Sequence, residues 1–219
     1  MKPLSVACVL ALGLAFVATA PAALAQRAAQ AATSAPAGAP AAPKLHAAMR
    51  SLLHGHIVAT RDYALAVREG SKAREKRATD AVVANAHQIA DAVAGFYGKA
   101  AGEQFFKLLA DHWEGVKALT DSTHAGDKAG EQKAMEELAS NGSDIAKFLS
   151  GANPNLPDET VKGLWMMHVN DHKIQIDEIM SGASQTEQTQ SWAEMQKHAN
   201  TIADALASGI AKQFPTKAH

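Results

Sequence analysis

An internal repeat is the feature that most constrains how this chain can fold. Three histidines and three glycines recur at intervals of 56 residues: His56, His112 and His168, and Gly70, Gly126 and Gly182. Repeats of this length indicate supersecondary units that stack on one another. Each unit continues into a similar tail, and the third tail is offset by one residue. We therefore expect three related units.

Apolar residues recur every three or four positions within each unit, which is the period of an α-helix. In the first unit the apolar stripe begins at Leu45, passes through His56 and ends at Gly70, then resumes after Ser71 and ends near Gly98. Turns this short join antiparallel helices. No segment alternates with the two-residue period of a strand over more than a few residues. We predict an all-α fold, a helical bundle of about six helices built from three repeated antiparallel helical hairpins.

The first 43 residues differ from the rest of the chain in composition. Residues 1–25 combine a basic start, an apolar run and a small-residue exit, the pattern of a cleaved secretory signal peptide. Residues 26–43 are almost wholly Ala, Pro, Gly, Gln and Ser, so they bury too little apolar surface to offset the entropy of ordering. We predict a signal peptide, a disordered Ala/Pro-rich tether, a single helical-bundle domain over residues 44–215, and a periplasmic or secreted protein.

Charge and cysteine content exclude several classes of function. The net charge is −1 at pH 7, which argues against nucleic acid as a partner, since such proteins carry a strongly basic face. The single cysteine, Cys8, lies in the predicted signal peptide. The mature chain therefore has no thiol for a disulfide, an iron–sulfur cluster, covalent haem or a cysteine nucleophile. We expect no stable membrane insertion after signal cleavage.

The repeated histidines lie on the apolar stripe, with polar residues opposite them in the second helix of each hairpin. The opposite residue is Asn85 in the first unit, Asn141 in the second and His198 in the third, at nearly the same distance from the turn glycine. At 1.5 Å per residue each pair lies roughly 20 Å from its turn. His172, one helical turn after His168, extends the same level. We expect a polar layer across the core.

Two interpretations of this layer remain open. Buried imidazoles and amides must find partners, so each His could donate to the residue opposite and fix the register of the helices. Alternatively, neutral imidazoles converge on a transition metal, Cu or Zn, while the amides orient the rings, and the affinity falls as pH drops through about 6.5. The candidate metal ligands are His56, His112, His168, His172 and His198, and the candidate orienting residues are Asn85 and Asn141.

Other chemistries have weaker support in the sequence. Met166, Met167 and Met195 lie near His168 and His198, which leaves non-covalent haem binding as a further alternative. Met at helical spacing, however, more often fills a core. The nucleophile elbow of hydrolases and the glycine-rich loops that bind nucleotides are absent. The sequence does not decide whether the protein is an enzyme, and it favours a protein without enzymatic activity.

Six segments of the chain carry a resemblance to known proteins: HIVATRDY from His56, FYGKAAG from Phe96, the pair Asp111-His112, FLSGANPNLP from Phe148, MMH ending at His168, and GIAKQFP from Gly209. Over roughly residues 45–215 the chain resembles a family of secreted bacterial helical-bundle proteins of uncharacterised activity. The resemblance implies export, helical architecture and recurring histidines at His56, His112, His168 and His198. The chain departs from the family pattern at Ala193 and Gln196 and in having His172. Some members carry a glycosyltransferase label, for which this chain has no sugar-nucleotide fold or acidic metal motif.

Overall fold

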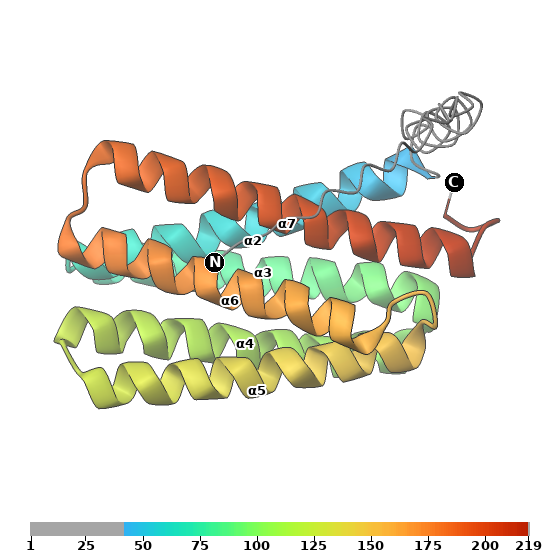
Figure 1. The fold of residues 1–219 in the computed structure, drawn as a ribbon, viewed down its shortest axis with the longest axis horizontal. Helices are drawn as coiled ribbons and strands as arrows, with labels where there is room; N and C mark the ends of the chain where they lie inside the picture. The colour runs from blue at the N-terminus through green and yellow to red at the C-terminus, as the bar shows by residue number, and fades with distance from the viewer. Residues whose placement is uncertain (1–41, 219) are drawn as a thin grey trace, which may run out of the picture. The chain divides into compact units, whose positions relative to one another are not determined.

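The computed structural model describes residues 42–218, and these residues form six α-helices without a strand. The helices are α2 (Pro43–Arg68), α3 (Lys72–Tyr97), α4 (Lys99–Ala125), α5 (Lys128–Ala152), α6 (Asp158–Ser181) and α7 (Gln185–Gln213) (Figure 1). The prediction of an all-α bundle is confirmed. The predicted signal peptide and nearly all of the predicted tether lie outside the described residues. None of the described helices combines the length and the hydropathy needed to cross a membrane.

Short connections make each helix run back along the preceding one. The turns after α2, α4 and α6 contain Gly70, Gly126 and Gly182, with φ of 67°, 70° and 73°. Glycine adopts this left-handed conformation readily because it has no Cβ to clash with the backbone. Gly98, with φ of 92°, is the single residue between α3 and α4. Three of these turns are the ones that the repeated glycines predict.

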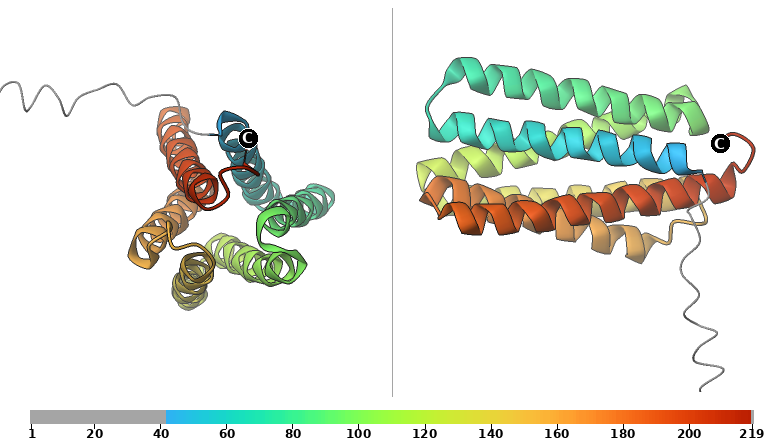
Figure 2. Two further views of the ribbon diagram at one scale, coloured as in Figure 1. Left: turned by 90° about the vertical axis from the view of Figure 1, so that its right-hand side faces the viewer. Right: turned by 90° about the horizontal axis from the view of Figure 1, so that it is seen from above.

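The six helices close into a ring. Each packs against its neighbours along the chain, and α7 packs against α2, as the end-on view in Figure 2 shows. Across the centre α2, α4 and α6 contact one another, whereas α3, α5 and α7 lie between them on the outside. Packing between successive hairpins is as extensive as packing within them, so the three repeated hairpins stay a prediction. The inner helices α2, α4 and α6 bring distant parts of the sequence together.

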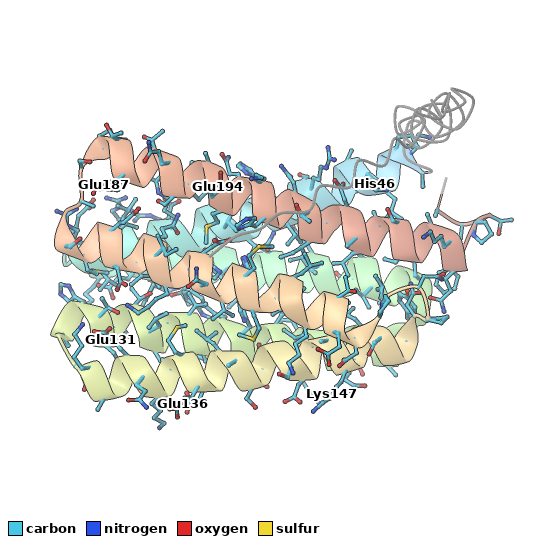
Figure 3. The ribbon with its side chains drawn as sticks, viewed as in Figure 1. His46, Glu131, Glu136, Lys147, Glu187 and Glu194 are labelled. Carbon is cyan, nitrogen blue, oxygen red and sulfur yellow. The ribbon has the colours of Figure 1, made fainter. Side chains whose placement is uncertain are left out.

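Polar contacts between α2 and α7 help to close the ring. The Nδ1 atom of His46 lies 2.9 Å from Asp204 Oδ1, and Arg50 donates two hydrogen bonds to the same carboxylate, at 2.8 and 2.6 Å. Figure 3 labels His46 near the start of α2. Ala42 and Ala218, just beyond the predicted domain limits, are buried in a small cluster at this end of the domain. The first and last helices are thus fastened to each other.

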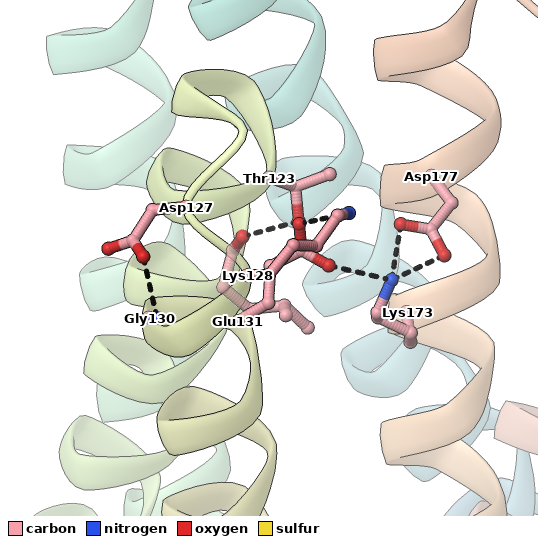
Figure 4. Close-up of polar contacts among 8 residues, drawn as sticks. Thr123, Asp127, Lys128, Gly130, Glu131, Lys173 and Asp177 are labelled. Carbon is pink, nitrogen blue, oxygen red and sulfur yellow. Dashed lines mark hydrogen bonds and ion pairs between the residues drawn. The ribbon is translucent and has the colours of Figure 1, made fainter.

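A group of ion pairs holds α5 against α6 near the turn glycines (Figure 4). Asp127 caps α5 by accepting a hydrogen bond from the first turn, at 3.0 Å. The buried carboxylate of Glu131 accepts a hydrogen bond from Lys128 at 2.6 Å and lies 3.4 Å from the Lys173 ammonium on α6. Lys173 also pairs with Asp177. Glu131 is buried, and the two ammonium groups compensate its charge, which would be costly to bury without a partner.

The polar layer divides the apolar core into two clusters. One cluster lies on the side of the layer away from the turn glycines and includes Met49, Leu53, Phe105, Leu149, Leu206 and Ile210. The other lies on the side of the turn glycines and includes Tyr63, Val67, Val116, Leu119, Leu138 and Ile179. Between them lie the buried imidazoles of His56, His112, His168 and His172. Apolar residues therefore flank these rings on both sides.

Candidate metal centre

Four imidazoles meet at the centre of the bundle. His56 comes from α2, His112 from α4, and His168 and His172 from α6. One ring nitrogen from each residue lies within 4.8 Å of the corresponding nitrogen of every other. The ring centroids are separated by 4.4 to 6.0 Å. These four residues form a histidine tetrad.

The positions of the four residues along their helices account for the convergence. His56, His112 and His168 recur at the spacing of the repeat on the three helices that meet across the centre. His172 follows His168 by one helical turn, so both side chains project from the same face of α6. Their Nε2 atoms lie 3.1 Å apart. Histidines that are equally spaced in the sequence therefore lie at a common level in the core.

Burial keeps the tetrad neutral. His112, His168 and His172 are 1–2 % exposed, and His56 is 9 % exposed. Burial and, to a smaller extent, the neighbouring His112 lower the pKa of His56 from 6.5 to about 3. Burial likewise lowers the pKa of His112 to about 4, although its hydrogen bond with Asn141 opposes the shift. The pKa values of His168 and His172 are also well below 6.5 for the same reason. Neutral imidazole is the form that binds a metal.

Asn141 orients one ring of the tetrad. Its Oδ1 atom lies 3.2 Å from His112 Nδ1, and its Nδ2 donates to the Leu108 carbonyl at 2.9 Å. Because an amide oxygen only accepts hydrogen bonds, the His112 proton sits on Nδ1 and the Nε2 lone pair is free. The buried Nε2 of His112 and Nδ1 of His168 have no hydrogen-bond partner among the described residues. Unpaired buried nitrogens of this kind call for an explanation, such as a role in metal binding.

Asn85, at the equivalent position on α3, forms no hydrogen bond with any of the described histidines. Its Nδ2 donates to the Leu52 carbonyl at 3.0 Å, and its Oδ1 has no partner among residues 42–218. A Cβ at Gly55 would lie 2.9 Å from this Nδ2, so the absence of a side chain there lets the amide lie against the α2 backbone. The expected hydrogen bond from each histidine to the residue opposite is therefore found for His112 alone and is wrong for His56.

The fifth predicted ligand, His198, lies outside the tetrad. Its Nδ1 donates to Asp171 Oδ2 at 2.7 Å, and its Nε2 lies 3.9 Å from Glu194 Oε2. His198 stands 16 positions after its turn glycine, one more than Asn85 or Asn141. One residue turns a helical side chain by about 100°, and α7 is an outer helix, so His198 meets the flank of α6 rather than the centre. Burial raises the pKa of Asp171, and the hydrogen bond from His198 opposes that shift.

The sequence interpretation missed Asp171 as a member of this site. The signal was present, because Asp171 stands between the two tetrad histidines of α6, where a charged residue needs a partner if it is buried. Gln175 is a second buried polar residue on α6, and its Nε2 has no hydrogen-bond partner among the described residues. Both residues add polar groups to the α6 side of the polar layer.

The donor set of the tetrad fits a transition-metal ion. Zinc–nitrogen bonds of about 2.0–2.1 Å place the four ligands of a tetrahedral site about 3.3–3.4 Å from one another. The tetrad nitrogens, between 3.1 Å and at most 4.8 Å apart, need modest side-chain rotations to reach this distance. Neutral imidazoles suit zinc, copper and nickel, whereas calcium and magnesium prefer oxygen ligands.

A haem group does not fit beside the tetrad. The cavity that touches His56, His112 and His168 has a volume of about 30 Å³ and is otherwise lined by apolar residues. Sites for cofactor-sized ligands have volumes of about 300–1,000 Å³. Met195, one of the methionines that suggest haem binding in the sequence, is buried in the apolar core. The space around the rings accommodates a single ion rather than a porphyrin.

No protein-family model, curated protein or solved structure matches the chain. The resemblance to secreted helical-bundle proteins therefore stays a prediction. What the tetrad binds must be inferred from its own geometry and surroundings.

Proposed function

We propose that this protein is an exported helical bundle that binds one transition-metal ion, copper or zinc, through His56, His112, His168 and His172. One observation carries the proposal: four neutral imidazoles from three helices converge within 4.8 Å in a core closed to solvent. A buried polar atom without a partner costs about 1–3 kcal/mol. A bound ion would give the unpaired Nε2 atom of His112 the partner that it lacks.

The surroundings of the tetrad support tight binding. Asn141 holds His112 in the tautomer that presents Nε2 to an ion. The apolar clusters on both sides exclude water, which would otherwise compete for the ion. The signal-like residues 1–25 support export, and the thiol-free mature chain suits an oxidising compartment, because imidazole ligands are not lost to disulfide formation.

The test is a titration of metal-free protein with Cu²⁺ and, separately, with Zn²⁺, monitored by the melting temperature. The ion should raise the melting temperature because it stabilises only the folded state, in which the three helices meet. His112→Ala should lose most of this rise, whereas His124→Ala, at an exposed position near the end of the same helix, should keep it. Equal losses in the two variants, or no rise in the unaltered protein, would contradict the proposal.

Two further measurements separate the ligands from their neighbours. His198→Ala should retain most of the rise, because His198 bonds Asp171 outside the tetrad. Elemental analysis of the untagged protein, purified from its native compartment, should give one ion per chain. A substoichiometric metal content combined with a full response to added ion would identify a site that is emptied during purification.

A second candidate function is a purely structural layer that fixes helix register. The hydrogen bond between His112 and Asn141, which joins α4 to α5, favours it. In that case replacing both residues by leucine should be neutral or stabilising, while His112→Leu alone strands Asn141 and costs about 1–3 kcal/mol. A double variant less stable than the single one, measured in metal-free buffer, would exclude the register function.

A further inference from the structure

A metal ion must cross the wall of the bundle to reach the tetrad. All four rings are at most 9 % exposed, and they lie between two apolar clusters. A cation cannot pass through apolar packing alone, because losing its hydration without replacement ligands is prohibitively costly. Any route from solvent to the tetrad therefore needs polar donor groups along its length.

The seam between α6 and α7 contains such donors. Asp171 precedes the tetrad residue His172 on α6 and accepts a hydrogen bond from His198 on α7 at 2.7 Å. The other nitrogen of His198 lies 3.9 Å from a carboxylate oxygen of Glu194, one turn away on α7. The side chains of Glu194, His198 and Asp171 are 58 %, 23 % and 8 % exposed. Their decreasing exposure follows the seam from solvent to Asp171, the residue that directly precedes His172 in the sequence.

The other two hairpins carry neutral amides where this seam carries metal-binding groups. Asn85 on α3 bonds the Leu52 carbonyl, and Asn141 on α5 bonds His112. At the corresponding place α7 has His198, and the partner of His198 is a buried carboxylate. A layer that only fixed register would be served by a third amide. The exchange of an amide for an imidazole between two carboxylates distinguishes this seam from the others.

We propose that a divalent transition-metal ion enters the tetrad through the seam between α6 and α7, with Glu194, His198 and Asp171 as successive transient ligands. This inference rests on the proposed metal binding by the tetrad. The ion displaces Lys197, whose ammonium lies 3.0 Å from the Glu194 carboxylate, and exchanges hydration water for the Nε2 atom of His198. It then passes Asp171 and reaches the tetrad, where the Nε2 atom of His112 has no hydrogen-bond partner among the described residues.

The same arrangement explains why the ion would not stay at the seam. Glu194 and His198 offer one donor atom each on the solvent side, whereas the tetrad offers four nitrogens. Sites through which ions pass must bind strongly enough to admit the ion and weakly enough to release it. The seam is suited to transfer, and the tetrad is suited to retention.

The test compares the rates of Zn²⁺ uptake and release with the dissociation constant. Metal-free full-length mature protein is mixed with Zn²⁺ in a stopped-flow instrument containing a zinc-responsive dye, and release is measured into excess chelator. Glu194→Gln and His198→Asn should each slow uptake and release by about tenfold, the lower end of what local charge contributes to association rates. The dissociation constant should stay the same, because groups on a route lower the barrier in both directions. Glu136→Gln, the same charge change on the exposed face of α5, is the matched control and should alter neither rate.

Each other outcome overturns the route in a recognisable way. Unchanged rates in both variants, with Zn²⁺ still bound, would exclude the route and leave the proposed function standing. A lower melting temperature in His198→Asn with normal uptake would show that His198 only fastens α7 to α6. Faster release and weaker binding of Zn²⁺ in His198→Asn would show that His198 is a ligand of the bound ion rather than a group on its route. If the unaltered protein binds neither Zn²⁺ nor Cu²⁺, both the proposed function and the route are contradicted. Glu194 is exposed, so Glu194→Gln decides the question even if His198→Asn does not fold.

Discussion

His168 and His172 share a hydrogen bond through their Nε2 atoms, which lie 3.1 Å apart although both rings are buried. One ring donates an N–H group and the other accepts it through an unprotonated nitrogen, so the accepting ring must be neutral. A proton added to either ring would be buried next to the other three imidazoles. The tetrad is therefore intolerant of acid in the absence of metal.

The free energy of unfolding of the metal-free protein should fall steeply as the pH drops below about 6.5. Unfolded histidines bind protons near pH 6.5, whereas the folded pKa values are about 3 for His56 and about 4 for His112, and well below 6.5 for His168 and His172. The unfolded state then binds more protons than the folded state. Each ring lowers the free energy of unfolding by about 1.4 kcal/mol for every pH unit below this range. With a total stability of about 5–15 kcal/mol, we expect unfolding between roughly pH 6 and pH 4.

Urea unfolding at several pH values measures this dependence. His124→Ala should leave the slope unchanged, because that side chain is exposed. A free energy of unfolding that is constant from pH 7.5 to pH 5.5 would show that the tetrad is protonated as easily in the folded state as in the unfolded state.

The Zn²⁺ affinity of the folded protein should change little between pH 7.5 and pH 6. The sequence alone predicts a loss near pH 6.5, the ordinary histidine range, but burial lowers the pKa of His56 to about 3 and that of His112 to about 4. Protons therefore do not compete with the ion until the pH is far lower. Competition with a chelator of known affinity measures the constant. A loss of about tenfold per pH unit across this range would indicate ligands with ordinary pKa values.

Asn141→Leu should destabilise the metal-free protein more than Asn85→Leu. Both substitutions remove an equivalent hydrogen bond, from Nδ2 to the Leu108 or the Leu52 carbonyl. Only Asn141→Leu also strands the N–H of the buried His112, which adds about 1–3 kcal/mol. Chemical denaturation of the two variants gives the difference. Equal losses would mean that the contact between Asn141 and His112 contributes nothing to stability.

Two glycines inside helices should respond to alanine in opposite directions. A Cβ at Gly102 would lie 2.6 Å from Ala94 Cβ and 2.9 Å from the Ala90 carbonyl oxygen, so Gly102→Ala should force α4 away from α3 and cost about 1–3 kcal/mol. At Gly163 nothing lies within 4 Å, and Gly163→Ala should stabilise the protein by about 0.5–1 kcal/mol. Thermal unfolding measures both effects. A stabilising Gly102→Ala would mean that the contact between α3 and α4 is looser than described.

The sequence was sufficient to predict the helices and part of the site. Apolar period and turn glycines predict an all-α bundle because both signals are local. The spacing of His56, His112 and His168 indicates a common level because each of them stands 14 positions before a turn glycine. His172 follows from helical geometry, one turn after His168.

The remaining features depend on contacts between segments that are distant in the chain. Periodicity assigns His198 to the apolar stripe, yet it cannot distinguish a ring that points to the centre from one that points to Asp171 on the neighbouring helix. Nor does it reveal that Asn85 turns to the backbone of α2 while Asn141 turns to His112. Which helices take the inner positions is decided by the packing of all six together, and no local pattern encodes that packing.

The division of the core by the polar layer bears on how the domain opens. Apolar contacts that are continuous through a core favour unfolding as one cooperative unit, whereas here the buried imidazoles lie between the cluster around Leu53 and the cluster around Leu138. In the absence of metal, hydrogen exchange would detect two regions of α2, α4 and α6 that open with different free energies. An ion held by ligands from all three helices at this boundary would make the two regions open together, so that its occupancy sets the size of the cooperative unit.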